Sequence, residues 1–320
     1  MRSREMNKML KWVPMLTAMQ RAVLACALEC KDHSARVRQM IESRVVQAQT
    51  GCPHCGHTQL LRHGQVSGLQ RWRCKACGRT FNALTKTPMA RLRMKAKWLL
   101  QQQVSELGLS VAKAAAQLQV SPSTAFRWRH RFLKLAQPVK AQALLGVAEA
   151  DETYFLHSNK GQSLSGRKAR HRGGKASKRG LSRELIPVLV ARDRSGATAD
   201  FVLSAASKAE IVAALQPRLS ADAVLCTDGS LAMATAAKQL GVHHEAVNLS
   251  AGERVRGAWH IQNANAYHSR LKAWLRRFNG IATSHLESYL AWFRALDRSA
   301  KNPSKPAPML ALALGLGDHP

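Results

Sequence analysis

Leu145-Gly-Val-Ala-Glu-Ala-Asp151 and Ala223-Val-Leu-Cys-Thr-Asp228 are two short apolar runs, and each of them ends in an aspartate. Runs of this length and composition predict buried β-strands. A carboxylate at the end of a strand can hold a divalent metal ion, and two such carboxylates side by side can hold the pair of ions that phosphodiester chemistry uses. Whether Asp151 and Asp228 form one site therefore depends on which strands are neighbours.

The elements around these runs follow a defined order. The sequence predicts strands at 145–155, 185–194, 197–204, 223–228 and 243–248, and helices at about 207–217, 230–240, 261–278 and 284–297. Three consecutive strands, followed by alternating helices and strands, is the element order of an RNase H-like fold, an α/β domain with a mixed five-stranded sheet. The first and fourth strands of that fold lie side by side. We therefore expect Asp151 and Asp228 to approach each other within a domain at 144–298.

The chain is strongly basic. It holds 49 Lys and Arg against 19 Asp and Glu, a formal net charge of +30 with a pI near 10.9. This balance favours a polyanionic partner, with nucleic acid as the leading candidate and an anionic membrane as a weaker one. Apolar stretches fall short of the roughly 20 residues that span a bilayer, and no secretory signal is recognised. We therefore expect a cytoplasmic, nucleoid-associated protein that does not bind membranes.

Three segments are less informative. The helical N-terminal region at 1–48 has no assigned function, and the tail at 299–320 indicates nothing further. Residues 158–183 form a basic insertion between the first two strands, with Lys, Arg and Gly but no acid. This insertion is either a solvated, disordered loop or a contact for nucleic acid.

Four cysteines predict a small zinc ribbon at 49–88. They form two Cys-x-x-Cys pairs, Cys52-Pro-His-Cys55 and Cys74-Lys-Ala-Cys77, at the spacing of a four-cysteine Zn²⁺ site. A structural zinc ion stabilises a unit that is too small to have its own hydrophobic core. The ribbon is either a pure scaffold or also a DNA contact, and Arg71 and Arg73 on its predicted strand favour the contact.

A helix-turn-helix is predicted within the helical domain at 89–137. One amphipathic helix runs from Ser110 to Leu118, and a second begins at Ser121-Pro122, with serine as the N-cap and proline at the first helical position. The N-terminal part of the second helix would enter a major groove of DNA. We expect its DNA contacts to come from Ser123, Thr124, Arg127, Arg129 and Arg131. The alternative is plain packing of three helices.

A third metal ligand is expected from a late helix. The helix at 261–278 carries Asn265, with His268 three residues on and Lys272 seven residues on, all on one face. The sequence leaves open whether His268 is a satisfied interior histidine or a catalytic group.

Three acids could also join the site. Glu149 shares the strand parity of Asp151 but lies one step deeper, and Glu152 should point to the opposite face of the sheet. Glu253 lies in the loop before the late helix, where carboxylates are usually solvated.

Three motifs in order carry a family resemblance: Ala150-Asp-Glu-Thr-Tyr-Phe155, Cys226-Thr-Asp-Gly229 and His260-Ile-Gln-Asn-Ala-Asn-Ala-Tyr-His-Ser-Arg-Leu-Lys272. With the zinc ribbon and the helix-turn-helix before them, the chain resembles the insertion-sequence transposases of the ISXO type, over about residues 50–297. Members of that family commonly carry Glu as the third metal ligand. The aligned position here is Asn265, which resembles a related subgroup that uses Asp, Asp, Asn and Lys.

The resemblance implies an enzyme of the DDE class that binds the terminal inverted repeats of its element and catalyses metal-dependent DNA cleavage and strand transfer. Asp151, Asp228 and Asn265 would be catalytic and would hold two Mg²⁺ or Mn²⁺ ions, and Lys272 would contact phosphate or stabilise charge in the transition state. Because Asn offers an oxygen without a charge, the site has one negative group fewer.

The partner implied is double-stranded DNA, both at the element ends and at the target. Two DNA ends must be joined, so a homo-oligomer, at least a dimer on DNA, is expected. The first rival hypothesis is a non-catalytic DNA-binding regulator built from the zinc ribbon and the helix-turn-helix. The second is an RNA-associated zinc-ribbon protein.

Overall fold

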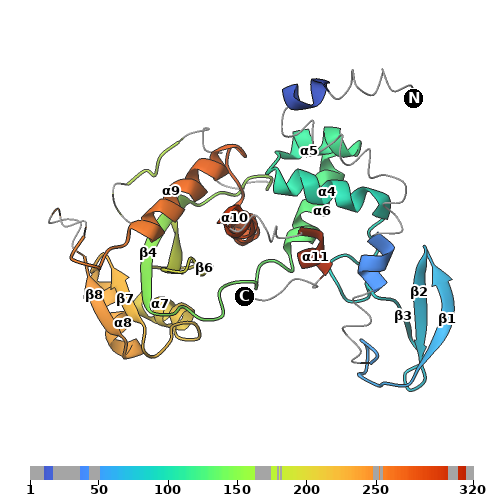
Figure 1. Ribbon diagram of the computed structural model, residues 1–320, viewed down its shortest axis with the longest axis horizontal. Helices are drawn as coiled ribbons and strands as arrows, with labels where there is room; N and C mark the ends of the chain where they lie inside the picture. The colour runs from blue at the N-terminus through green and yellow to red at the C-terminus, as the bar shows by residue number, and fades with distance from the viewer. Residues whose placement is uncertain are drawn as a thin grey trace. The chain divides into compact units, whose positions relative to one another are not determined.

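The structure is a computed structural model of the 320-residue chain. It describes residues 11–16, 37–42, 51–162, 174–178, 180, 182–247, 252, 255–301 and 309–314. The chain divides into two compact units, Met1–Leu135 with Ala307–Gly317, and Ala136–Pro306 with Asp318–Pro320 (Figure 1). Most of the predicted N-terminal region, much of the basic insertion and Glu253 lie outside the described residues. Within the described ranges, no helix is long and apolar enough to cross a membrane.

The first unit contains a small antiparallel sheet. Its strands are β1 (Leu60–Val66), β2 (Leu69–Cys74) and β3 (Thr80–Phe81), in the order β1-β2-β3. Ser67 and Gly68 connect β1 to β2, with φ angles of 52° and 74°. Two consecutive positive φ angles are typical of the tight hairpin turn whose twist matches the two strands.

The described part of the first unit also contains helices. Their bounds are η1 (Val13–Met15), η2 (Lys95–Lys97), α4 (Trp98–Glu106), α5 (Val111–Leu118), α6 (Pro122–Leu133) and α11 (Met309–Leu314). Ser110 and Ser121 cap α5 and α6, because each hydroxyl accepts a hydrogen bond from the backbone amide three residues on. Gln119, with a φ of 51°, ends α5 and turns the chain toward α6. The predicted helix boundaries at this turn are confirmed.

The helix α11 comes from the tail in which the sequence indicated no role. Leu310 and Leu314 are fully buried in one core with Trp98 of α4 and with Trp128 and Phe132 of α6. A six-residue helix is not stable by itself in water. Packing against the core of the first unit therefore stabilises it.

The second unit is built on a mixed five-stranded sheet. Its strands are β4 (Val147–Leu156), β5 (Leu185–Asp193), β6 (Thr198–Val202), β7 (Val224–Thr227) and β8 (His243–Ala246). Their order is β6-β5-β4-β7-β8, with antiparallel pairs among the first three strands and parallel pairs from β4 to β7 and from β7 to β8. The predicted neighbourhood of the first and fourth strands is confirmed.

Helices cover both faces of this sheet (Figure 1). They are α7 (Lys208–Leu215), α8 (Leu231–Leu240), α9 (Gln262–Arg276) and α10 (Leu286–Lys301), with the short η4 (Thr283–His285) before α10. Ala148 and Ala150 of β4 pack into the core formed with α7 and α8. Because side chains alternate along a strand, Glu149 and Asp151 face the other layer, where α9 lies.

Buried polar bonds fix α9 and α10 to the sheet. Asp200 of β6 accepts a hydrogen bond from the Tyr267 hydroxyl of α9 at 2.9 Å and pairs with Arg294 of α10. Arg192 of β5 donates to Asp297 of α10 at 2.9 Å. These pairs are almost fully buried, so their satisfied geometry specifies one position of the two helices.

Candidate active site and DNA-binding surface

Asp151 and Asp228 meet at the centre of the sheet. The parallel register pairs Ala148 with Leu225 and Glu149 with Cys226, so Asp151 lies level with Asp228. Carboxylate oxygens of Asp151, Glu152 and Asp228 lie within 4.8 Å of one another. The predicted convergence of two distant acids is therefore present, with a third carboxylate beside them.

Glu152 departs from what strand parity predicted. Its carboxylate reaches the other two acids, so the expectation that it turns away from the site is wrong. The pairing between β4 and β7 ends at Glu149 and Cys226, and β7 itself ends at Thr227. Beyond this point no strand of the described residues pairs with that side of β4, and the long Glu side chain can bend toward the end of β7.

Burial and mutual repulsion shape the electrostatics of these acids. Burial, and then the charge of Asp228, raise the pKa of Asp151 to about 6, against a lowering by the Lys272 ammonium. Burial raises the pKa of Glu152 to about 7, with contributions from the charges of Asp228 and Asp151. Three half-buried carboxylates that repel one another form a donor set of hard oxygens, which suits Mg²⁺ or Mn²⁺.

Glu149 has a different role from its neighbours on β4. Its carboxylate is fully buried and accepts hydrogen bonds from the backbone amides of Asn263 at 2.7 Å and Ala264 at 3.1 Å, and from the Asn263 side chain at 2.8 Å. Arg194 pairs with it at 3.2 Å. An anion at the first turn of a helix satisfies free amides there. Glu149 therefore anchors α9 to β4 and is not available to a metal ion.

The helix α9 brings three polar side chains to the site. Nδ1 of His268 lies 3.5 Å from a carboxylate oxygen of Asp151, and the His268 side chain is 8% exposed. Burial and the Lys272 charge lower the pKa of His268 to about 4. Asn265 is half-buried one turn before His268 and on the same face. Lys272 is exposed one turn after it, close enough to act on both His268 and Asp151.

His268 is not a satisfied interior histidine. Its Nε2 is buried and, among the described residues, has no hydrogen-bond partner. Sequence periodicity could place this residue on the right face of α9. It could not show that the ring would face Asp151, because that depends on how Glu149 anchors the helix.

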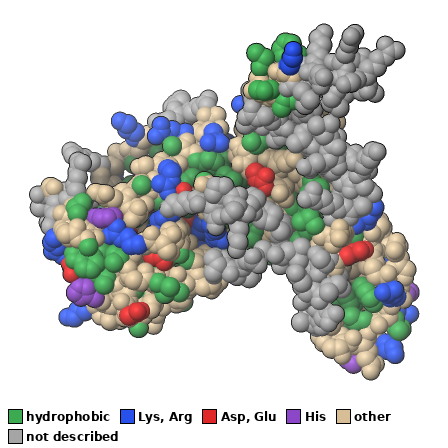
Figure 2. Space-filling view, viewed as in Figure 1, with side chains coloured by type: hydrophobic (Ala, Val, Ile, Leu, Met, Phe, Trp, Pro, Cys, Tyr) green, Lys and Arg blue, Asp and Glu red, His purple; other side chains and the backbone are tan. Residues whose placement is uncertain are grey.

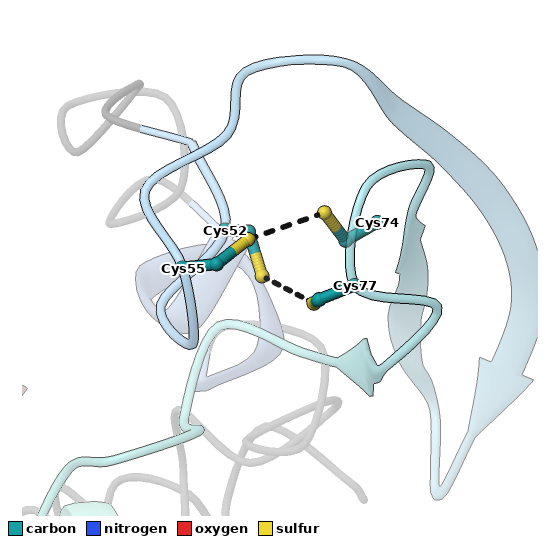
Figure 3. A group of neighbouring side chains, drawn as sticks. All are labelled: Cys52, Cys55, Cys74 and Cys77. Carbon is teal, nitrogen blue, oxygen red and sulfur yellow. Dashed lines mark hydrogen bonds between the residues drawn. The ribbon is translucent and has the colours of Figure 1, made fainter.

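The four cysteines converge at one end of the small sheet (Figure 3). The sulfur of Cys52 lies 3.7 Å from that of Cys77, and the sulfur of Cys55 lies 3.6 Å from that of Cys74. Tetrahedral coordination with Zn–S bonds of about 2.3 Å would place sulfurs about 3.8 Å apart. The backbone amide of His54 also points to the Cys52 sulfur at 3.4 Å, a contact that stabilises a thiolate. The cluster therefore fits Zn²⁺.

The residues predicted to contact DNA differ in their exposure to solvent. Ser123 and Arg127 of α6 are exposed and Thr124 is half-buried, and on the ribbon Arg73 is exposed and Arg71 half-buried. Figure 2 shows Lys and Arg side chains scattered over the visible face of each unit, with few Asp or Glu among them.

Two arginines of α6 bond to the protein itself. Arg129 is 3% exposed and donates a hydrogen bond to the Leu109 carbonyl at 2.6 Å. Its prediction as a DNA contact is therefore corrected, because its guanidinium is buried inside the helical unit. Arg131 is exposed but donates to the carbonyls of Pro88 and Ala90 at 3.0 and 2.9 Å.

A basic pocket of about 410 Å³ lies against α6, and its lining includes Arg91, Arg93, Thr124, Arg127 and Arg131. Arg91 and Arg93 were not singled out in the sequence, although they begin the basic run Arg91-Leu-Arg-Met-Lys-Ala-Lys97. The pocket widens the basic surface beside the exposed start of α6.

Two segments of the chain match models of known protein families. The ISXO2-like transposase domain matches residues 143–294, and a homeodomain-like, helix-turn-helix domain matches residues 90–138. The chain carries an ISXO2-like transposase domain. The matched residues include the whole five-stranded sheet and the four acids Glu149, Asp151, Glu152 and Asp228.

A curated relative and two solved structures add to this result. An uncharacterized protein in transposable element ISH50 of Halobacterium salinarum is 29% identical over 260 residues, which cover 80% of this chain and 88% of that protein. A pre-cleavage Mos1 transpososome is similar at 11% identity and a TM-score of 0.27, covering 97% of this chain and 96% of that one. A simian T-cell lymphotropic virus intasome is similar at 14% identity and a TM-score of 0.26, covering 67% and 66%. Both TM-scores are low, and the transposase function is supported by the family match and the relative.

Proposed function

We propose that this transposase binds the terminal inverted repeats of its insertion sequence and catalyses DNA cleavage and strand transfer with a DDE-type site of Asp151, Asp228, Asn265 and Lys272. The meeting of Asp151 and Asp228 beside α9 carries the proposal. The strand order β6-β5-β4-β7-β8, with two antiparallel and two parallel pairings, supports an RNase H-like catalytic domain.

Asp151, Asp228 and Asn265 would hold two Mg²⁺ or Mn²⁺ ions. When bound, such ions activate the attacking oxygen and stabilise the leaving oxygen of a phosphodiester. The chain itself contributes position and charge. His268, kept neutral by burial, limits the rotation of the Asp151 carboxylate without cancelling its charge. Lys272 is exposed on the same helix face and can contact a phosphate oxygen of DNA.

The first unit would select and hold the DNA. Ser123, Thr124 and Arg127 lie at the start of α6, the part of a recognition helix that contacts base edges in a major groove. Arg71, Arg73 and Arg131 would contact phosphates. A structural Zn²⁺ on Cys52, Cys55, Cys74 and Cys77 would stabilise the ribbon. Joining two DNA ends requires at least a dimer of the protein on DNA. The protein would act in the cytoplasm, at the nucleoid.

Strand cleavage tests the catalytic proposal. Labelled duplexes that carry the element ends are incubated with Mg²⁺ and the full-length wild type, Asp151→Ala or Asn265→Ala. Asp222→Asn is the matched control, since it removes an exposed acid of the same unit. We expect products from wild type and Asp222→Asn and none from Asp151→Ala. Equal products from all variants would reject the enzyme and leave the non-catalytic DNA-binding regulator.

Metal analysis tests the zinc site. We expect one zinc per purified chain, and loss of that zinc in Cys74→Ser. A full zinc content in Cys74→Ser would show that the four sulfurs do not hold the ion.

A comparison of binding to structured RNA and to duplex DNA ends tests the second rival hypothesis. Preference of the wild type for structured RNA would favour an RNA-associated zinc-ribbon protein.

A further inference from the structure

The proposed metal site lacks a charge at one of its expected ligands. Asn265 can offer a carbonyl oxygen, but it does not neutralise part of the charge of two divalent ions. Asp151 and Asp228 alone supply two negative groups. A site of this composition would bind metal ions more weakly unless another carboxylate contributes.

Glu152 brings that carboxylate to the site. Its oxygen lies within 4.8 Å of ligand oxygens of both Asp151 and Asp228, a span that a shared cation can bridge. Within the described parts of the chain, no Lys or Arg pairs with any of the three acids. The one partner at ion-pair distance is His268, at 3.5 Å from Asp151.

Two glutamates of β4 differ in their partners among the described residues. Glu149, three residues earlier, is surrounded by two backbone amides, the Asn263 side chain and Arg194. The buried Glu149 therefore has hydrogen-bond and ion-pair partners, whereas Glu152 has no Lys or Arg partner among the residues that the structure describes.

A second observation points to a ligand at the same place. His268 is nine-tenths buried, its ring faces Asp151, and its Nε2 has no hydrogen-bond partner among the residues that the structure describes. A buried ring nitrogen without a partner, beside three acids that no described Lys or Arg pairs with, is costly without a bound group. Both features would be relieved by a cation and its water ligands.

We propose that Glu152 is the third carboxylate ligand of the divalent-metal site and replaces the charge that Asn265 does not supply. The proposal rests on the proposed function, because it concerns the same site. Asn265 then provides a neutral oxygen from α9, and all of the negative charge comes from the ends of β4 and β7.

Mn²⁺ binding to the full-length protein tests this assignment without relying on activity. Calorimetric titration with MnCl₂ compares wild type with Glu152→Gln, Asp151→Asn and the control Asp222→Asn. We expect Glu152→Gln to weaken Mn²⁺ binding by at least about tenfold, since even the loss of an outer-shell partner can cost that much. Asp222→Asn should bind as wild type does. Circular dichroism checks folding, and Glu152→Asp, which keeps the charge with a shorter reach, should bind with intermediate affinity.

A compensating substitution separates ligation from a structural role. Asn265→Glu placed in the Glu152→Gln background should restore Mn²⁺ affinity, because it returns the lost carboxylate from the other side of the site. Failure of that rescue, or unchanged affinity of Glu152→Gln while Asp151→Asn is impaired, would overturn the role of Glu152 and leave the proposed function intact. A wild type that binds no Mn²⁺ would overturn both.

Discussion

Glu149 and Glu152 lie three residues apart on β4, yet their carboxylates have opposite environments. The first is fully buried and bonded to the start of α9 and to Arg194. The second is half-buried beside two other acids with no cationic partner among the described residues. The comparison teaches that the same residue type on one strand can stabilise the fold or leave charge available for a ligand, depending on what packs opposite.

The helix α6 repeats this contrast with arginines. Arg127 is exposed near the start of the helix, whereas Arg129, two residues later, is buried and bonded to the Leu109 carbonyl. Positions two residues apart on a helix point in different directions. One arginine is therefore available to DNA and the other stabilises the unit.

The largest effect is expected at the acid between the two glutamates. Asp151→Asn should lower DNA cleavage on the order of 10³-fold or more, as for single residues of a catalytic set. It should change the free energy of unfolding little, because the Asp151 carboxylate accepts a hydrogen bond only from the neighbouring Glu152 amide among the described residues, and it is not bonded to the start of α9 as Glu149 is. Cleavage of labelled ends and urea unfolding of the same preparations measure both quantities. A loss of stability as large as that of a Glu149 variant would erase the distinction drawn along β4.

Glu149→Gln should have the next largest effect, on stability. The substitution leaves Arg194 without its buried partner and weakens the anchor of α9, so we expect a loss of about 3 kcal/mol in the free energy of unfolding of the second unit. Urea titration followed by circular dichroism measures the change. An unchanged unfolding midpoint would show that the contacts of Glu149 with α9 do not stabilise the fold.

Arg127→Ala and Arg129→Ala should separate DNA binding from folding in α6. Arg127→Ala should weaken binding to element ends by about tenfold, within the 1–3 kcal/mol typical of one base contact, and leave stability unchanged. Arg129→Ala should instead destabilise the first unit by about 2 kcal/mol, since it removes a charged, buried hydrogen bond. Fluorescence anisotropy and thermal unfolding of both variants give the four values. Equal profiles for the two variants would contradict the difference in their exposure.

The smallest effect is predicted for the stability of Glu152→Gln. In buffer at pH 8 without Mg²⁺ or Mn²⁺, removing one of the clustered charges should raise the free energy of unfolding by about 1 kcal/mol, the repulsion of two unit charges 4 Å apart in water. This change is opposite in sign to that of Glu149→Gln. Destabilisation by Glu152→Gln would mean that Glu152 has a stabilising partner, which would contradict the difference drawn between Glu149 and Glu152.

Much of the fold could be predicted from local sequence. The strand expected at 145–155 is β4 at Val147–Leu156, and the helix expected at 261–278 is α9 at Gln262–Arg276. Apolar runs and serine caps act over a few residues, so their signals can be recognised without knowing the tertiary contacts. The convergence of Asp151 and Asp228 followed from the order of elements.

Other parts could not be predicted because they depend on packing. α11 joins the core around Trp98 and Phe132, which lie far away in the sequence. The site also includes Glu152, although strand parity predicted that it points to the opposite face of the sheet. Parity describes the direction in which a side chain leaves the strand, and not how far a long side chain bends.

The sequence by itself determined which functional motifs the chain contains and in what order. These are four cysteines at zinc spacing, a capped pair of helices, and two strands that each end in an aspartate. Tertiary structure decided which acid has no cationic partner among the described residues, Glu152, and which arginine is exposed, Arg127. Partners determine that choice, because a buried charge is stable only where amides or opposite charges meet it. Those partners come from distant elements, such as α9 for Glu149 and the chain at Leu109 for Arg129.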